Sequence, residues 1–140
     1  MSPGILFVCH GNICRSPMAV GIARKRLGTG MVAESAGIAP SGGKATEEAV
    51  LVMKAVYGVD ISNHKPRGVA EVDLAAFAYV IALDLSIYTR LKASDRVPKE
   101  RLFGWDIEDP IGLGYQTYKQ VAKKIEKRLE QFLENRGLGV

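Results

Sequence analysis

The sequence predicts an α/β fold: a single doubly wound domain in which a parallel sheet is flanked by helices on both faces. Short apolar runs alternate along the chain with segments of helical periodicity, and strands that alternate with helices pair in parallel. A length of 140 residues suits one core, so we expect residues 1–140 to form one domain. The hydrophobic fraction of 47% and the charged fraction of 24% are ordinary for a globular protein.

The first third of the chain predicts a strand, a helix and a second strand. Residues 4–9 (GILFVC) are an apolar run typical of a buried strand. Residues 17–28 predict a helix, because Pro17 suits a first turn and Gly28 suits a helix end. Residues 31–36 (MVAESA) predict the second strand.

The middle of the chain continues this alternation. Residues 46–57 predict a helix with Thr46 as its N-cap. Residues 78–83 (AYVIAL) are apolar throughout, as expected of a strand that is covered on both faces. Residues 86–93 predict a short helix, and residues 101–105 (RLFGW) carry a weaker signal for a fourth strand.

A long C-terminal helix is predicted between residues 115 and 136. Apolar side chains recur there at helical spacing, at Val121, Ile125, Leu129 and Phe132.

The carboxyl ends of parallel strands share one edge of a sheet, and ligands bind at that edge. We expect this edge to carry the loops that start near Cys9, Ser35, Asp84 and Trp105. The loop from Cys9 to Arg15 should therefore lie near the EDPIG segment at 108–112, about a hundred residues later.

The loop after the first strand joins that strand to a helix N-terminus, where free backbone N–H groups and the helix dipole favour an anion. Gly11 and Asn12 can adopt positive φ, which helps the loop to fold its amides inward. Arg15 adds a planar fork that matches two phosphate oxygens. The same field stabilises a thiolate at Cys9, to which Ser16 can donate a hydrogen bond.

These residues indicate nucleophilic phosphoryl chemistry. Cys9 would attack phosphorus, while Arg15 and the loop amides would hold the three equatorial oxygens. The chain has neither G-x-x-x-x-G-K-[ST] nor a G-x-G-x-x-G after its first strand, so the common nucleotide-binding loops do not explain the segment.

The run VCHGNICRSP at 8–17 resembles the active-site loop of low-molecular-weight protein tyrosine phosphatases. Further segments resemble later landmarks of that family, in the same order: ESAGI at 34–38, GVDISNHKPR at 58–67, VIALD at 80–84 and EDPIG at 108–112. The resemblance covers essentially the full length. It implies a four-stranded parallel sheet, no metal or other cofactor, and a cysteinyl-phosphate intermediate.

The resemblance also implies roles for individual residues. Cys9 matches the nucleophile, Arg15 the phosphate-binding arginine and Asp109 the general acid. From the residues alone, Asp106 and Asp84 share the same edge and remain alternative acids. The substrate-binding loop comprises His10, Gly11, Asn12, Ile13, Cys14 and Arg15. The network expected to support it comprises Asn12, Ser16, Ser35 and His64.

Cys14 has two possible roles. It could pack against the sheet, or it could form a disulfide with Cys9 under oxidation, because many members of the family carry a second cysteine at this place. The spacing of His10 and His64 from the cysteines matches no common zinc site, so we expect no metal.

The leading function is hydrolysis of phosphotyrosine in a protein or peptide. The closest rival is a protein-arginine phosphatase, because GGKAT and DPIG followed by YQTYKQ resemble that branch, although it carries threonine where this chain has Ile13. An arsenate reductase needs extra cysteines later in the chain, and none follows Cys14. A phosphopeptide-binding module would be expected to lack the nucleophile or the acid.

The remaining expectations come from charge and the chain start. A net charge of +4 is weak support for nucleic acid binding, and no apolar stretch has the length of a membrane span. We therefore expect the protein to bind neither nucleic acid nor a membrane. The first residues lack a charged n-region and a long apolar segment, so we expect a cytoplasmic protein without a signal peptide. We also expect a monomer.

Overall fold

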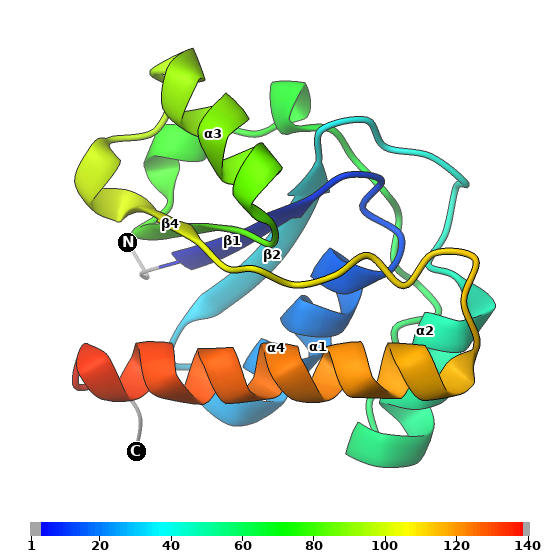
Figure 1. Cartoon of the computed structure of the whole chain (residues 1–140). Coiled ribbons are helices and arrows are strands. Elements are labelled where there is room, and N and C mark those ends of the chain that lie inside the picture. Colours follow the sequence, from blue (N-terminus) through cyan, green and yellow to red (C-terminus); the bar gives the residue numbers. More distant parts are fainter. Residues whose placement is uncertain (1–3, 139–140) are drawn as a thin grey trace.

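Four parallel strands form the central sheet of the computed structural model, which describes residues 4–138. The strands are β1 (Gly4–Cys9), β2 (Val32–Gly37), β3 (Tyr79–Ala82) and β4 (Leu102–Gly104). They lie in the order β2-β1-β3-β4, with β1 and β3 inside the sheet (Figure 1). All residues of β1 are buried, which explains its uninterrupted apolar sequence.

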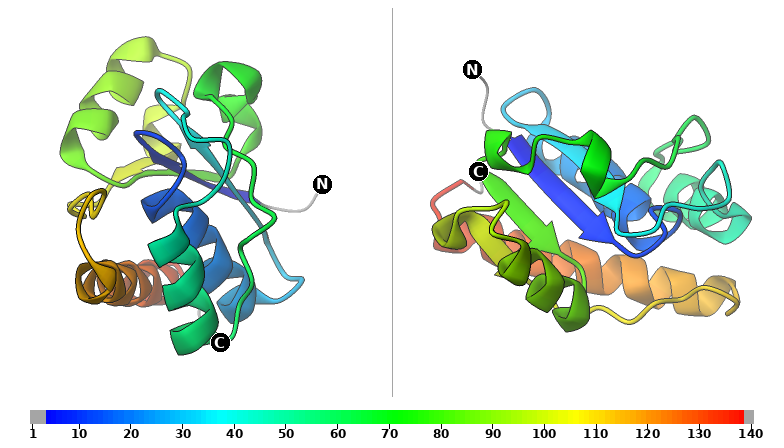
Figure 2. Two further views of the ribbon diagram at one scale, coloured as in Figure 1. Left: turned by 90° about the vertical axis from the view of Figure 1, so that its right-hand side faces the viewer. Right: turned by 90° about the horizontal axis from the view of Figure 1, so that it is seen from above.

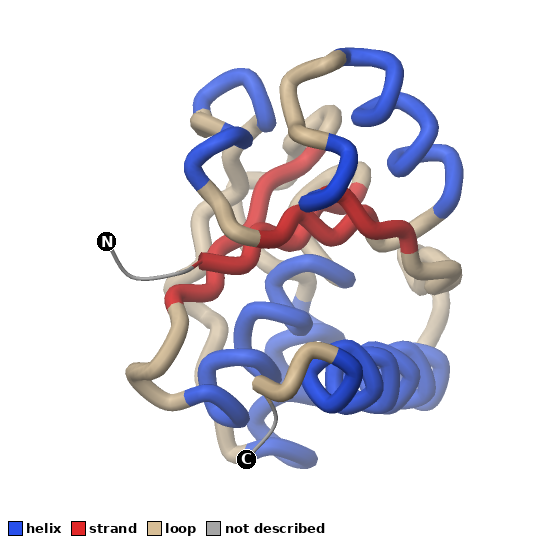
Figure 3. The backbone as a smooth tube through the Cα atoms, turned by 90° about the vertical axis from the view of Figure 1, so that its left-hand side faces the viewer, coloured by secondary structure: helices blue, strands red, loops and turns tan. Residues whose placement is uncertain are grey.

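Helices cover both faces of the sheet, as the alternation of elements predicts. α1 (Arg15–Leu27) and α4 (Tyr115–Asn135) pack against each other on one face. α3 (Leu85–Ser94) packs against β3 and β4 on the other face (Figures 2 and 3). Three short 3₁₀ turns, Val69–Glu71, Leu74–Ala76 and Lys99–Arg101, fill connections between these elements.

The helix predicted over 46–57 consists of two parts. α2 (Glu47–Val52) begins at Thr46, whose hydroxyl accepts a hydrogen bond from the amide of Ala49 at 3.4 Å. The chain then continues as a π-helical turn over Met53–Tyr57, which hydropathy patterning cannot distinguish from an α-helix.

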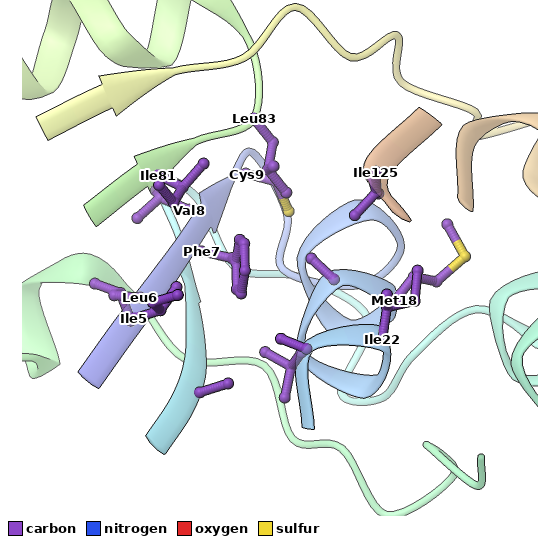
Figure 4. Packing of buried hydrophobic residues seen from close by; sticks show 14 of the residues in the cluster. Ile5, Leu6, Phe7, Val8, Cys9, Met18, Ile22, Ile81, Leu83 and Ile125 are labelled. Atoms are coloured by element: carbon purple, nitrogen blue, oxygen red, sulfur yellow. The ribbon is translucent and has the colours of Figure 1, made fainter. Parts of the chain in front are cut away.

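Apolar side chains of the sheet and of α1 and α4 form one core. Figure 4 shows Phe7 of β1, Met18 and Ile22 of α1 and Ile125 of α4 within it. Trp105 is 2% exposed, and its ring centroid lies 5.9 Å from that of Phe7. In residues 4–138, no helix has the length and apolar character to cross a membrane.

The register of the sheet places the carboxyl ends of the strands at one edge. Cys9 pairs with Gly37, and Ala82 pairs with both Val8 and Gly104. The loops that follow β1, β3 and β4 therefore leave the sheet side by side, and the segment after β4 passes over this edge before α4 begins (Figure 1).

Candidate active site

The loop between β1 and α1 is held by its own carbonyl groups. The carbonyl oxygens of residues 9–13 all accept hydrogen bonds from outside the loop. The backbone amides of Ile38, Ala39 and Ser41 donate to the carbonyls of residues 9, 10 and 11. The His64 imidazole donates to the carbonyl of residue 12, and the amide of Thr46 donates to that of residue 13. A trans peptide directs its N–H away from its C=O. The N–H groups of residues 10–14 therefore point to the inner side of the loop and form an anion-binding concavity.

Close backbone packing requires glycine beside this loop. A Cβ atom on Gly37 would lie 2.7 Å from the carbonyl oxygen of His10 and 3.0 Å from Asn12. Only a residue without a side chain allows the end of β2 to approach the loop so closely.

Cys9 is the last residue of β1, and its sulfur lies inside the loop, with 2% of the residue exposed. The amide of Asn12 donates to the sulfur at 3.3 Å. The hydroxyl of Ser16 lies 2.9 Å from it and donates to the sulfur when Cys9 is ionised. Both contacts place a hydrogen-bonding group directly against the sulfur.

Asn12 is fully buried and adopts the left-handed conformation, with φ of 58°. Its side-chain amide donates to Ser16 Oγ at 2.7 Å and to Ser35 Oγ at 3.0 Å. Its Oδ1 accepts from the amide of Arg67 at 2.9 Å, and His64 Nε2 donates to its carbonyl at 2.6 Å. The structure thus brings together Asn12, Ser16, Ser35 and His64, and adds Arg67 to the set.

The imidazole of His64 is held as the neutral form. Burial lowers the pKa of His64 most, and the charges of Arg24 and Arg67 lower it further, while the hydrogen bond to Asn12 works in the opposite direction. A neutral imidazole with its proton on Nε2 still donates to the Asn12 carbonyl.

Arg15 is 2% exposed and is anchored through one of its terminal nitrogens. Nη1 donates to Asp84 Oδ2 at 3.0 Å and to the carbonyl of Ile107 at 2.9 Å. The buried Nε has no hydrogen-bond partner among the described residues. The Nε and Nη2 side of the guanidinium is the side left to bind an oxyanion.

Asp84 anchors Arg15 and is occupied on both oxygens. It caps α3 by accepting from the amide of Ile87 at 2.8 Å, and it also accepts from Ser86 Oγ at 2.8 Å. Burial works to raise the pKa of Asp84, but these hydrogen bonds and Arg15 outweigh burial and lower the pKa below its usual range. Sequence reasoning treated Asp84 only as an alternative acid; its N-cap position in DLSIY was the available signal for an anchoring role.

Asp109 reaches the same guanidinium from the loop after β4. Its Oδ2 lies 3.7 Å from Arg15 Nη2, and its Oδ1 accepts from the amide of Ile111 at 3.1 Å. Its side chain is 41% exposed, so solvent reaches the carboxylate. Asp106 is exposed and makes no hydrogen bond or ion pair with Arg15 within residues 4–138.

Cys14 is a second buried thiol at the site, and both cysteines are free. Its sulfur donates to Asp109 Oδ1 at 3.7 Å. Burial raises the pKa of Cys14 to about 12, and the negative charges of Asp109 and Cys9 contribute to this rise. Cys14 is therefore a neutral thiol near pH 7.

Two other loop residues differ in exposure. His10 is exposed beside the loop, whereas Ile13 is partly buried and packs against the edge of the core. Across residues 4–138, no three His, Cys, Asp or Glu side chains are grouped in a way that could hold a metal ion.

Comparisons with known proteins show which family and fold this chain resembles. The family model described as "Low molecular weight phosphotyrosine protein phosphatase" matches residues 4–137. A similar solved structure is the low molecular weight protein tyrosine phosphatase of T. tengcongensis, with a TM-score of 0.86 and 36% identity over 96% of this chain and 99% of that one. The YwlE arginine phosphatase of Geobacillus stearothermophilus has a TM-score of 0.82 and 26% identity over 97% and 96%.

A curated relative carries a different description. Arsenate reductase 1 of Staphylococcus haemolyticus is 34% identical over 137 residues, which covers 93% of this chain and 94% of that protein. The fold is thus shared by proteins described as phosphatases and as reductases.

Proposed function

The chain belongs to the low molecular weight phosphotyrosine protein phosphatase family, and from this we propose that it hydrolyses phosphotyrosine monoesters through a cysteinyl-phosphate intermediate. The observation that carries the proposal is the position of the Cys9 sulfur. It lies inside a loop whose amides point inward, beside a buried arginine that has an unpartnered Nε–H.

In the first step, the Cys9 thiolate attacks phosphorus, so that an S–P bond forms while the bond from phosphorus to the tyrosyl oxygen breaks. The loop amides and the Nε and Nη2 side of Arg15 stabilise the charge on the equatorial oxygens. Asp109, acting as the general acid, gives a proton to the departing phenolate oxygen. The hydroxyl of Ser16 stabilises Cys9 as a thiolate before attack and again when it leaves.

In the second step, water attacks the phosphorus of the intermediate. The Asp109 carboxylate takes the proton from this water, the S–P bond breaks, and inorganic phosphate and the Cys9 thiolate are released. Asp84 is already engaged by Arg15, Ser86 and Ile87, which favours Asp109 as the acid and base.

A protein-arginine phosphatase is the second candidate. The structural similarity to an arginine phosphatase over nearly the whole chain supports it. Ile13 argues against it, because an isoleucine side chain offers no hydrogen bond to a guanidinium. Apolar contact discriminates between substrates by only about 1–3 kcal/mol, so some activity on both is compatible with this loop.

Arsenate reduction is disfavoured by cysteine content. The chain has two cysteines, Cys9 and Cys14, and both belong to the loop. No cysteine follows Cys14 that could resolve an oxidised intermediate, although the curated relative is described as an arsenate reductase.

The variant Cys9→Ser tests the nucleophile. A serine hydroxyl keeps its proton near pH 7, so turnover of aryl phosphates should vanish, while phosphate-analogue binding should survive on Arg15 and the loop amides. Steady-state assays and analogue titration measure the two effects. Clear residual turnover would sink the assignment of Cys9.

Hydrolysis of matched phosphotyrosine, phosphoserine and phosphoarginine peptides tests the substrate, with arsenite formation from arsenate measured in parallel. We expect the highest kcat/KM for phosphotyrosine and no arsenite. Ile13→Thr should shift the ratio of kcat/KM from phosphotyrosine toward phosphoarginine. A wild type that already prefers phosphoarginine would replace the first candidate with the second.

A further inference from the structure

A second cavity lies behind the phosphate-binding loop, on the side of α1 that faces the segment 59–67. Its volume is about 450 Å³, within the range of small-molecule sites. The residues proposed to act on phosphate, Cys9, Arg15 and Asp109, do not line it. It is therefore separate from the groups that bind phosphate, although Ser35, His64 and Arg67 of the loop-supporting network line it.

The wall of this cavity carries three cationic side chains and two carboxylates. Arg24, Lys65 and Arg67 line it, against the carboxylates of Glu34 and Asp60. Arg24 donates to the carbonyl of Ala33 through Nε at 3.2 Å and through Nη2 at 3.0 Å. Glu34 forms an ion pair with Arg67. Asp60 is exposed and accepts a hydrogen bond from the amide of Ser62 at 2.8 Å. Lys65 has no ion-pair or hydrogen-bond partner within residues 4–138, so its ammonium is available to a ligand.

The opposite wall is apolar. Val20 of α1 lines it together with Val59 and Ile61. A Cβ atom on Gly21 of α1 would come 3.2 Å from Ile61 Cγ2 and 3.3 Å from Val59 Cγ1. Glycine at this position allows the segment 59–61 to pack closely on α1, and that packing shapes the cavity.

We propose that this cavity binds a small aryl carboxylate, with the carboxylate toward Lys65 and Arg24 and the ring against Val20 and Val59. One charged edge and one apolar wall match the two halves of such a molecule. The apolar side chains of a small-molecule site supply contact area, and a few charged groups fix the orientation of the ligand. Dicarboxylates or inorganic ions would leave the apolar wall without a partner.

Occupancy of the cavity is coupled to the phosphate-binding loop. His64 and Arg67 line the cavity and also hold Asn12, the first through its imidazole and the second through its amide. A ligand in the cavity would therefore contact residues that support the loop without entering the loop itself.

Nuclear magnetic resonance of the two histidines separates the two sites. The chain contains only His10 and His64. His10 reports on the mouth of the phosphate site and His64 on the cavity. Benzoate is the probe, added to the full chain. We expect saturable shifts of the His64 imidazole signals, with a dissociation constant on the order of 1 mM, typical of so small a ligand, and unchanged His10 signals.

Lys65→Gln should weaken benzoate binding about three- to tenfold, as expected for the loss of one charged contact. Lys99→Gln is the matched control, since Lys99 is an exposed lysine beside β4, at the opposite edge of the sheet from β2. The site is refuted if His64 does not shift, if only His10 shifts, or if Lys65→Gln binds as tightly as the wild type. This readout requires no catalytic activity, so its failure is distinct from failure of the proposed function.

Discussion

The position of Asp109 is fixed by three neighbouring groups. Arg15 lies 3.7 Å away, and the amide of Ile111 and the thiol of Cys14 both donate to its Oδ1. These contacts hold the carboxyl group on the side of Arg15 where a leaving-group oxygen of bound substrate would lie, as a general acid requires.

Asp109→Asn should lower kcat by roughly 10²–10⁴ for phenolate leaving groups that need a proton. The loss should shrink for more acidic phenols, which leave without one. A series of aryl phosphates of graded leaving-group pKa measures this dependence. Asp106→Asn is the matched control, and an equal loss across the series, or a larger effect of Asp106→Asn, would remove Asp109 from the mechanism.

Cys14 has a pKa raised to about 12, mainly by burial, so it does not compete with Cys9 for substrate near pH 7. Cys14→Ser should leave activity under reducing conditions within about twofold, since serine also donates to Asp109. Peroxide converts Cys9 to a sulfenic acid, which the Cys14 sulfur can attack to give a disulfide and water.

The variant should consequently recover less activity when thiols are added after peroxide treatment. Recovered activity against time of exposure is the measurement. Equal recovery of wild type and Cys14→Ser would show that the two cysteines do not form a redox pair. The role of Cys14 would then be limited to packing in the core and to its hydrogen bond to Asp109.

The end of β2 is fastened to the loop by the segment around Arg67. Arg67 Nε donates to the carbonyl of Ser35 at 3.0 Å, and the amide of Gly37 donates to the carbonyl of Arg67 at 2.9 Å. These bonds fix the strand end that carries Ser35, and Ser35 accepts from Asn12. A side chain distant from phosphate thus positions the loop that binds it.

Arg67→Met should reduce kcat between about 3- and 30-fold, because small displacements of a catalytic loop are costly while the main-chain bonds of residue 67 remain. Arg96→Met is the matched control: Arg96 also binds two main-chain carbonyls, those of Val69 and Val72, away from the loop. Both variants should unfold cooperatively. A comparable loss in the two would indicate general destabilisation rather than positioning.

Elements with a strong local signal were predictable from the sequence. The run GILFVC and the recurrence of Val121, Ile125 and Leu129 record burial directly, and β1 and α4 lie within a residue or two of their predicted bounds. The π-turn at Met53–Tyr57 was not predictable, because α- and π-helical turns share nearly the same apolar pattern.

The site was predictable where one segment contains both functional residues, as the loop 9–15 contains Cys9 and Arg15. Parallel pairing also predicted that the loop after β4 would approach residues 9–15, and Asp109 does lie beside Arg15. The anchors of Arg15 were not predicted. The carbonyl of Ile107 belongs to the main chain and has no sequence signal. The N-cap position of Asp84 indicates that its carboxylate is held in place, but its contact with Arg15 depends on the direction in which β3 ends, which a local pattern does not give.

The stability of the whole protein should depend on pH through His64. Burial lowers the pKa of His64 in the folded state, whereas the unfolded chain has the usual value of about 6.5. As the pH falls through that value, the unfolded state binds the proton first, so the free energy of unfolding decreases. The contribution of neutral His64 to the free energy of unfolding is complete above about pH 6.5 and is lost as the pH falls below that value. The pKa of Asp84 is lowered from 3.8, so protonation of Asp84 affects stability only at more acidic pH and does not overlap with the titration of His64.

His64→Gln removes the titration while its side-chain amide can still donate to the carbonyl of Asn12. The single tryptophan, Trp105, is buried and reports unfolding by fluorescence. Urea unfolding at pH 7.5, 6.5 and 5.5 should show the stability of the wild type falling toward that of His64→Gln as the pH decreases. His10→Gln, at the exposed histidine, should follow the wild type at every pH. A wild-type advantage that stays constant would mean that His64 has the same pKa in the folded and unfolded states, and one that grows toward pH 5.5 would mean that His64 gains its proton more readily in the folded protein.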